Sequence, residues 1–235
     1  MSGEAYTHVL VIGHPRGGTS ILFNMLTAGW PEFDHAKGET RAEADLSLPG
    51  NRISKAPLDS LNRLAITEAA QRHGKRLAVV QIVRDPRDVM TSRWFRDGYA
   101  VEPHHYRNSE GCKVREMGYL PVYYGLAEWR HTHDPILVLR YEDLVTDTLG
   151  QQRRVEALLG RSVSGLQFEF FHLARNVFLK AGDRANELTR AFVGRWRSPE
   201  HAERIREVFG SSSEMRAAVR ELRYEKDDNW LTEVA

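Results

Sequence analysis

The chain has 235 residues, of which 41% are hydrophobic and 28% are charged, and this is enough for one α/β domain with an ordinary core. The net charge of +1 argues against nucleic acid as a partner, and the single cysteine, Cys112, excludes an intrachain disulfide and a cysteine metal cluster. Because no hydrophobic run approaches a membrane span and the first residues lack a signal-peptide pattern, we expect a cytoplasmic protein with no membrane contact.

Residues 8–26 predict a strand, a glycine-rich turn and a helix. The strand is the hydrophobic run from Val9 to Ile12, and the helix follows from hydrophobic residues at helical spacing over 20–26. The turn between them, GHPRGG at 13–18, leaves unpaired backbone N–H groups at the N-terminus of the helix, where an anion can bind. This part of the chain therefore predicts a phosphate-binding loop.

The loop differs from a Walker A motif in the place of its cation. Gly13 and Gly18 have the Walker spacing, but Thr19 stands where that motif has lysine, and the positive charge is Arg16, inside the turn. An arginine in the turn suits a shorter anion, such as one phosphate that carries one transferable group. The alternative is a P-loop nucleotide-binding protein or a small-molecule kinase that uses ATP.

The segment after the first helix is polar. Residues 30–51 have no clear periodicity and predict a long loop that can include a short helix, and loops of this length are usually functional. Hydrophobic residues on one face predict a helix over 57–73, and the run at 77–83 predicts a second buried strand.

A second candidate ligand-binding segment follows this strand. Asp85 is suited to the N-cap and Pro86 to the first turn of a helix, which we expect to continue to about residue 96. Arg84 at the strand end and Ser92 on the helix are then placed to hold one ligand group together.

The rest of the chain predicts one more strand and several helices. Residues 98–121 look irregular, and 136–139 form a third short strand that ends at Arg140 and Tyr141. Helices are expected at about 122–131, 148–159, 199–209 and 213–222. Since there is no clear linker or repeat, we expect a single domain over 1–235.

Three strands that are each followed by a helix predict an α/β protein with a parallel sheet. Ligands of such sheets bind beyond the carboxyl ends of the strands. Gly13, Arg84 and Tyr141 all fall at such ends, so one ligand could contact all three.

Four segments together resemble the sulfotransferases that use 3′-phosphoadenosine 5′-phosphosulfate (PAPS). They are the loop GHPRGGTS at 13–20, VRDPRDVMTS at 83–92, LRYEDLVTD at 139–147 and FVGRWR at 192–197. The resemblance covers most of the chain. It implies a P-loop NTPase-like three-layer sandwich with a central parallel sheet flanked by helices. It also implies that PAPS is the donor, that its desulfated form (PAP) is the product, and that no metal is needed.

The same resemblance implies roles for the matching residues. The loop residues Gly17, Gly18, Thr19 and Ser20 would hold the 5′-phosphosulfate, and Arg84 and Ser92 would hold the 3′-phosphate. Tyr141 would lie near the adenine, and Arg195 and Trp196 would close over the nucleotide. Arg16 stands where cytosolic members usually carry lysine and tyrosylprotein members carry arginine, and it would stabilise the leaving phosphate.

The general base is expected in the loop after the first helix. Gly38-Glu39-Thr40-Arg41 resembles the stretch that supplies a glutamate base in tyrosylprotein sulfotransferases, which points to Glu39. Cytosolic members use histidine, so His35 is the main alternative, followed by His104 and His105. The acceptor would be a small-molecule or carbohydrate hydroxyl. Its identity and the oligomeric state stay open at this point.

Overall fold

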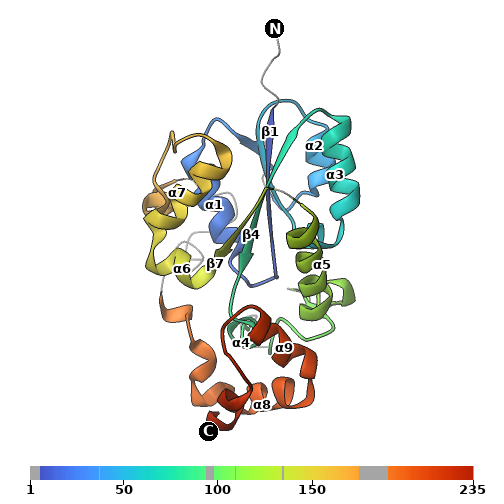
Figure 1. Cartoon of the computed structure of the whole chain (residues 1–235), viewed down its shortest axis with the longest axis vertical. Coiled ribbons are helices and arrows are strands. Elements are labelled where there is room, and N and C mark those ends of the chain that lie inside the picture. The colour runs from blue at the N-terminus through green and yellow to red at the C-terminus, as the bar shows by residue number, and fades with distance from the viewer. Residues whose placement is uncertain are drawn as a thin grey trace.

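The computed structural model describes residues 6–36, 38–93, 98–108, 110–133, 135–174 and 190–234. At its centre lies a five-stranded parallel sheet with the strand order β2-β3-β1-β4-β7, part of which is visible in Figure 1. In that order the strands are Asp34–His35, Arg52–Lys55, Thr7–Gly13, Arg76–Val83 and Ile136–Arg140. The predicted α/β class and the parallel sheet are confirmed.

Helices cover both faces of this sheet, as Figure 1 shows. On one face lie α1 (Thr19–Gly29), α6 (Tyr141–Thr146) and α7 (Thr148–Leu159), and on the other α2 (Ala42–Leu46), α3 (Arg63–Arg72) and α5 (Tyr119–Thr132). Strand β4 is buried between the two layers. Its residues Val80 and Ile82 pack into the α1 side of the core, and Val79 packs into the α5 side. Burial on both faces explains why the strand is hydrophobic along its length.

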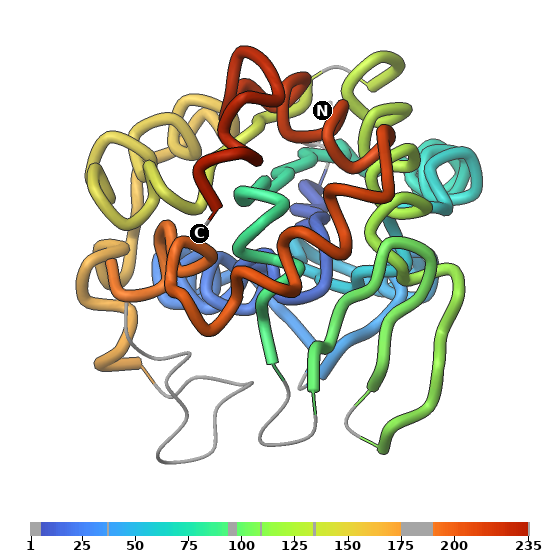
Figure 2. Tube along the Cα trace, turned by 90° about the horizontal axis from the view of Figure 1, so that it is seen from below, coloured from blue at the N-terminus to red at the C-terminus, as the bar shows by residue number. Residues whose placement is uncertain are grey.

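The C-terminal helices lie at the carboxyl ends of the strands. Figures 1 and 2 show α8 (Ala202–Ser211) and α9 (Ser213–Glu221) beside the short helix α4 (Pro86–Met90) below the sheet. Arg87 of α4 is buried against them: its guanidinium pairs with Asp85 at 2.8 Å and lies 3.9 Å from the ring centre of Trp196. Helix α4, which follows the end of β4, is therefore held between the sheet and the C-terminal part of the chain.

Two of the five strands were not predicted. Residues 30–51 contain a short helix, α2, as the sequence allowed, but also the strand β2, and β3 follows directly. All four residues of β3 are buried although three of them are polar. Arg52 is paired with Asp45 at 3.3 Å, so the burial of its charge is compensated by a residue on another element. A strand stabilised in this way lacks the hydrophobic run by which buried strands are recognised.

Two predicted helices are shorter than expected. The helix predicted over 57–73 is instead a 3₁₀ helix, η1 (Pro57–Leu61), followed by α3. Helix α4 ends at Met90, where the hydroxyl of Thr91 donates to the carbonyl of Arg87 at 2.9 Å. Ser92 therefore lies just beyond the helix and not on it. Residues 94–96 of that predicted helix lie outside the described residues.

The segment predicted to be irregular, 98–121, contains a small hairpin. Strands β5 (Tyr106–Arg107) and β6 (Lys113–Val114) pair antiparallel and lead into η2 (Arg115–Met117). Helix α5 begins at Tyr119, three residues earlier than expected. Further 3₁₀ helices within the described ranges are η3 (Phe168–Leu173), η5 (Arg190–Phe192), η6 (Arg195–Arg197), η7 (Pro199–His201) and η8 (Asn229–Glu233).

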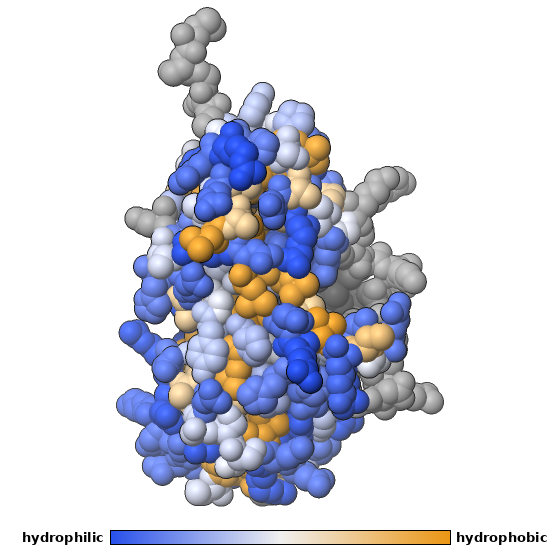
Figure 3. All heavy atoms as spheres, turned by 90° about the vertical axis from the view of Figure 1, so that its right-hand side faces the viewer, coloured by the Kyte–Doolittle hydropathy of each residue, from blue (hydrophilic) through white to orange (hydrophobic). Residues whose placement is uncertain are grey.

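Figure 3 shows the side of the molecule on which α2, α3 and α5 lie in Figure 1. This face is mostly hydrophilic, with hydrophobic side chains gathered across its middle. Among the helices of the described ranges, none has the length and hydropathy that crossing a bilayer requires.

Candidate active site

The glycine-rich loop joins β1 to α1, and two of its residues, Arg16 and Gly18, have positive φ. Gly18, the N-cap of α1, has φ of 103°, and a Cβ there would lie 2.7 Å from the ring of Tyr141. Arg16 has φ of 65°, which is uncommon for a residue with a side chain. Such strained residues cluster at functional sites, where the surrounding structure holds them in place. Glycine is thus required at position 18 for both conformation and space.

A buried histidine, His14, supports the loop. The His14 ring stacks on Tyr119 with ring centres 4.0 Å apart, and its Nε2–H donates to the Tyr119 carbonyl at 3.2 Å. Burial lowers the pKa of His14 to about 3, so the ring is neutral near pH 7. The N–H of Gly17 donates to the carbonyl of His14 at 2.9 Å and closes the turn. His14 therefore fixes the loop and carries no charge into the site.

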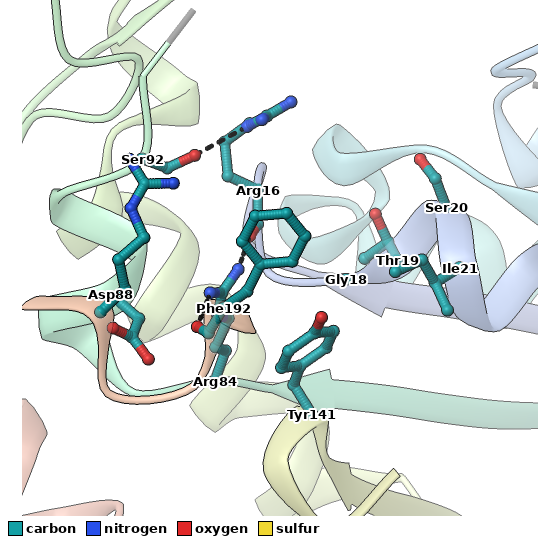
Figure 4. Close-up of a pocket in the computed structure, with 11 residues that line it drawn as sticks. Arg16, Gly18, Thr19, Ser20, Ile21, Arg84, Asp88, Ser92, Tyr141 and Phe192 are labelled. Carbon is teal, nitrogen blue, oxygen red and sulfur yellow. Dashed lines mark hydrogen bonds between the residues drawn. The ribbon is translucent and has the colours of Figure 1, made fainter. Parts of the chain in front are cut away.

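The first of two cavities at the loop has a volume of about 200 Å³ and is shown in Figure 4. It joins the loop, the end of β4, the start of α6 and the C-terminal segment. We call it the Tyr141 cavity. Its lining residues are Arg16, Gly18, Thr19, Ser20, Ile21, Arg84, Asp88, Ser92, Tyr141, Phe192 and Arg195. The structure thus brings together most of the residues predicted to bind a nucleotide, from four separate segments.

Arg84 connects three of these segments. Its guanidinium lies 4.6 Å from the ring centre of Tyr141 and donates to the carbonyls of Arg16 (at 3.1 Å) and Phe192, as Figure 4 shows. Its Nε is buried and has no hydrogen-bond partner among the described residues. A buried cationic N–H of this kind fits an anionic ligand, since leaving it unpaired is costly.

Arg16 and Ser92 are in direct contact. The Nε–H of Arg16 donates to the Ser92 hydroxyl at 2.9 Å. Burial lowers the pKa of the Arg16 guanidinium, with Arg84 and Arg195 adding repulsion, yet an arginine stays protonated near pH 7. Three arginines therefore surround this cavity, and their mutual repulsion favours a ligand with several negative charges.

Asp88 holds the C-terminal segment in place. Its carboxylate accepts the backbone N–H groups of Gly194 at 2.8 Å and Trp196 at 3.0 Å. Burial raises the pKa of Asp88, while Arg84 and the two N–H groups act in the opposite direction. The segment that carries Arg195 is fixed to α4 by these two bonds.

The second cavity opens on the other side of the loop and has a volume of about 390 Å³. We call it the Glu39 cavity. Its lining residues are Pro15, Arg16, Thr19, Ser20, Glu39, Lys55, Pro57, Tyr106, Asn108, Val114 and Met117. Arg16, Thr19 and Ser20 line both cavities. The loop therefore forms the boundary at which a group could pass from one ligand to another.

Lys55 links the two sides of this boundary. Its Nζ lies 2.5 Å from the Glu39 carboxylate and donates to the Ser20 hydroxyl at 2.9 Å. The Lys55 side chain is 3% exposed, whereas that of Glu39 is 49% exposed. The sequence reasoning missed Lys55 because its strand was missed. The signal that could have found it is a lysine between Ile53 and Pro57, at the end of a short segment after the long polar loop.

Several predicted site residues lie elsewhere. Gly17 and Trp196 line neither cavity; Gly17 closes the turn, and Trp196 is buried among the C-terminal helices. His35 packs edge-on against Phe23, 5.8 Å between ring centres, and also lines neither cavity. His104 and His105 also line neither cavity. Of the proposed bases, Glu39 is the one that the structure places at the loop.

No cluster of three or more metal-binding side chains was found in the part of the chain that the structure describes. The side chains that face the two cavities instead supply hydrogen bonds and positive charge. Such a site can bind a phosphate-bearing ligand and stabilise negative charge that develops at the loop.

Comparisons with known proteins agree with this geometry. A family model described as "Sulfotransferase domain" matches residues 6–215. No curated protein sequence matches the chain. Among solved structures, the sulfotransferase domain from the curacin biosynthetic pathway superposes with a TM-score of 0.65 and 13% identity, over 94% of this chain and 98% of that one.

Two further solved structures have the same fold. The sulfotransferase domain of the Synechococcus PCC 7002 olefin synthase gives a TM-score of 0.56 at 18% identity and covers 84% of this chain and 90% of its own. The mouse sulfotransferase SULT7A1, solved in complex with PAP, gives 0.55 at 16% identity and covers 90% and 88%. The family model covers nearly the whole chain, and this protein therefore belongs to the sulfotransferase family.

Proposed function

We propose that the protein transfers a sulfuryl group from PAPS to a hydroxyl group of a small acceptor. The observation that carries this proposal is the pair of cavities that meet at Arg16, Thr19 and Ser20. One has the arginines and the aromatic ring that a nucleotide with two phosphate positions needs, and the other has a carboxylate that can take a proton. Family membership favours sulfuryl transfer over phosphoryl transfer.

The donor is assigned to the Tyr141 cavity. Arg84 and Ser92 would hold the 3′-phosphate, Tyr141 would lie near the adenine, and Arg195 would close over the nucleotide. The loop N–H groups at the start of α1, with the hydroxyls of Thr19 and Ser20, would hold the 5′-phosphosulfate. The binding of PAP by the mouse structure of the same fold supports this assignment.

Three side chains at the loop would take part in the transfer step. PAPS supplies a sulfuryl group on a phosphate leaving group, and negative charge grows on the oxygen between them as the group moves. Arg16 is placed to stabilise that charge, and the Glu39 carboxylate to take the acceptor proton. Lys55 holds Glu39 at the loop through their contact at 2.5 Å and adds a second positive charge there. Positioning and charge stabilisation together account for the chemistry, as in phosphoryl transfer.

Calorimetry with PAP tests the donor assignment. We expect PAP to bind without added metal, and ATP with Mg²⁺ to bind far more weakly. Arg84→Ala should weaken PAP binding about tenfold to a hundredfold, because a charge-assisted contact worth roughly 1.5–3 kcal/mol is lost. The exposed Arg72→Ala, on α3, removes the same charge away from the cavity and should bind PAP normally.

Two outcomes would contradict this assignment. Normal PAP binding by Arg84→Ala would remove Arg84 from the 3′-phosphate site. Binding of ATP with Mg²⁺ in preference to PAP would favour the kinase alternative over sulfuryl transfer.

A further inference from the structure

Arg195 reaches the Tyr141 cavity from a backbone that is fixed on both sides. Asp88 accepts the N–H groups of the neighbouring residues Gly194 and Trp196. The Arg195 side chain, which lines the cavity, has one hydrogen bond within the described residues: its Nε–H donates to Nε2 of His201 at 3.4 Å. Under the function proposed above, on which this inference rests, Arg195 closes over the nucleotide. The contact with His201 therefore sets where its positive charge lies.

His201 itself lies outside the cavity. Its side chain is fully buried at the end of η7, and it is not among the residues that line the Tyr141 cavity. Its ring centre is 6.1 Å from that of Tyr99. The guanidinium groups of Arg93 and Arg204 lie 5.1 Å and 4.7 Å from the Tyr99 ring centre, and the second of them pairs with Glu102 at 2.8 Å. The charge that faces the ring from this side is therefore mainly that of Arg93.

The neutral His201 ring carries its proton on Nδ1. An arginine N–H can only donate, so Nε2 accepts from Arg195 and the ring proton is left on the other nitrogen. Burial lowers the pKa of His201; Arg195 and Arg93 add to this effect, while Glu200 opposes it. The ring is therefore mostly neutral at pH 7 and able to accept the hydrogen bond from Arg195.

Protonation would change the partner of Nε2. A protonated imidazole has an N–H at both nitrogens and can accept no hydrogen bond. It would also face the Arg195 guanidinium with a like charge. The Glu200 carboxylate lies 3.5 Å from the same Nε2 atom and can pair with the protonated ring. One nitrogen thus has two alternative partners, and the proton decides between them.

We propose that His201 is a positioning residue of the donor site: its neutral ring holds Arg195 at the Tyr141 cavity, and its protonated ring releases Arg195 and pairs with Glu200. Donor affinity then falls as the pH falls through the pKa of this ring. The charge that the ring gains does not compensate, because it is paired with Glu200 and lies outside the cavity. The donor site is thus made sensitive to acid by a residue that does not contact the donor.

Calorimetric titration with PAP at half-unit steps from pH 7.5 to pH 5 tests this proposal. His201→Gln is the central variant, because the glutamine oxygen can accept from Arg195 but takes up no proton. We expect it to bind PAP at pH 7.5 within about twofold of the unchanged protein. Between pH 7.5 and pH 5 the unchanged protein should lose about threefold to tenfold more affinity than His201→Gln, because a hydrogen bond of a charged group is lost. The phosphates of PAP titrate equally in both experiments.

Two further variants separate this role from a structural one. Glu200→Gln removes the carboxylate that receives the protonated ring, so the extra loss of affinity should move to lower pH and shrink within this range. The Glu200 side chain is 57% exposed, so this protein should fold. His73→Gln, at an exposed residue after α3, is the matched control and should keep the pH dependence of the unchanged protein.

A double-mutant cycle shows whether His201 acts through Arg195. Arg195→Ala should weaken PAP binding at pH 7.5, and adding His201→Gln to it should change neither the affinity nor its pH dependence any further. His201→Ala leaves Arg195 no acceptor and should bind PAP about threefold to tenfold more weakly than His201→Gln at pH 7.5. Thermal unfolding checks that each variant is folded, and if His201→Ala is not, the other variants decide.

Equal pH dependence in the unchanged protein and His201→Gln would overturn the inference, and so would a pH difference between them that persists in the Arg195→Ala background. Normal PAP binding by Arg195→Ala would remove Arg195 from the donor site, and His201 with it. Failure of the unchanged protein to bind PAP would instead reject the proposed function.

Discussion

Glu39 and His35 lie in the same short stretch of chain, yet the structure gives them different surroundings. Glu39 faces the cavity beside Lys55, at 2.5 Å, and shares that cavity with Arg16 and Ser20. His35 belongs to β2, and its Nδ1 lies 3.2 Å from the carbonyl of Ala36. A base must come within hydrogen-bond reach of the proton that it removes. This geometry supports Glu39 as the base.

A pair of substitutions tests this at the residue scale. Glu39→Gln keeps the size of the side chain but removes the basic oxygen, so kcat should fall by roughly 10²–10⁴-fold. PAP affinity should stay close to that of the unchanged protein, because Glu39 does not line the Tyr141 cavity. The measurement is kcat with any acceptor found to be sulfated.

His35→Ala is the comparison and should keep substantial turnover. The opposite pattern, with Glu39→Gln active and His35→Ala inactive, would assign the base to the histidine, as in the cytosolic enzymes of the family.

At the scale of elements, one buried carboxylate joins the two segments that carry Glu39 and Lys55. Asp59, in η1, is 1% exposed and accepts the backbone N–H of Ala42 at 3.0 Å. It also pairs with Arg41 at 3.5 Å. Glu39 lies two residues before Arg41, and Lys55 four residues before Asp59. Asp59 therefore fixes the loop after β2 to the turn after β3.

Asp59→Asn should accordingly lower kcat about tenfold to a hundredfold while PAP affinity stays normal, since small displacements of a catalytic group are costly. Burial raises the pKa of Asp59 to about 6; Asp45 adds to this, while the Ala42 N–H and Arg41 oppose it. Protonation on going from pH 7 to pH 5 removes the charge that pairs with Arg41. The unchanged protein should therefore lose rate across this range.

The Asp59→Asn protein has no such charge to lose, so its rate should change less between pH 7 and pH 5. Asp34→Asn, at a residue whose side chain is 74% exposed, is the matched control and should keep normal kcat. Equal kcat in Asp59→Asn and Asp34→Asn would show that Asp59 does not position the site.

The elements also show what the sequence could reveal of the fold. The strands and helices that carry hydrophobic runs or clear caps were predicted, such as β4 and the Asp85 start of α4. The missed strand β3 depends on partners distant in sequence, because Arg52 is buried with Asp45 and Lys55 with Glu39. Periodicity does not record such pairs. Likewise, α4 ends at Met90 although no glycine or proline follows it directly, so its end is not marked in the sequence.

At the scale of the molecule, the site is assembled where distant segments meet. The Tyr141 cavity combines residues from the N-terminal loop to Arg195, and most of them were predicted from motifs that mark the carboxyl ends of strands. The Glu39 cavity is lined partly by the β5–β6 hairpin, whose two-residue strands leave almost no pattern in the sequence. The Tyr141 cavity was therefore more predictable than the Glu39 cavity.

Buried histidines, His8 and His14 among them, make the whole molecule sensitive to acid. Burial lowers the pKa of both His8 and His14 to about 3, with Lys75 and Arg52 adding to the effect at His8. In the unfolded chain a histidine titrates near 6.5. Between about pH 6 and pH 4 the unfolded chain thus binds about two more protons at these rings. Their contribution to stability is present above pH 6.5 and is lost as the pH falls.

Asp59 acts in the opposite direction, because its pKa is raised to about 6 and the folded protein binds its proton first. For these three groups the net difference is about one proton, so together they should lower the free energy of unfolding by about 1.4 kcal/mol between pH 6 and pH 5. His8→Gln can keep the contact with Ser54, now 2.8 Å from the ring, but cannot take up a proton. It should lessen the fall in the free energy of unfolding between pH 6 and pH 5, measured by urea unfolding, by about 1.4 kcal/mol. The exposed His73→Gln should leave this fall unchanged, and an equal fall in all three proteins would show that burial of His8 does not control acid stability.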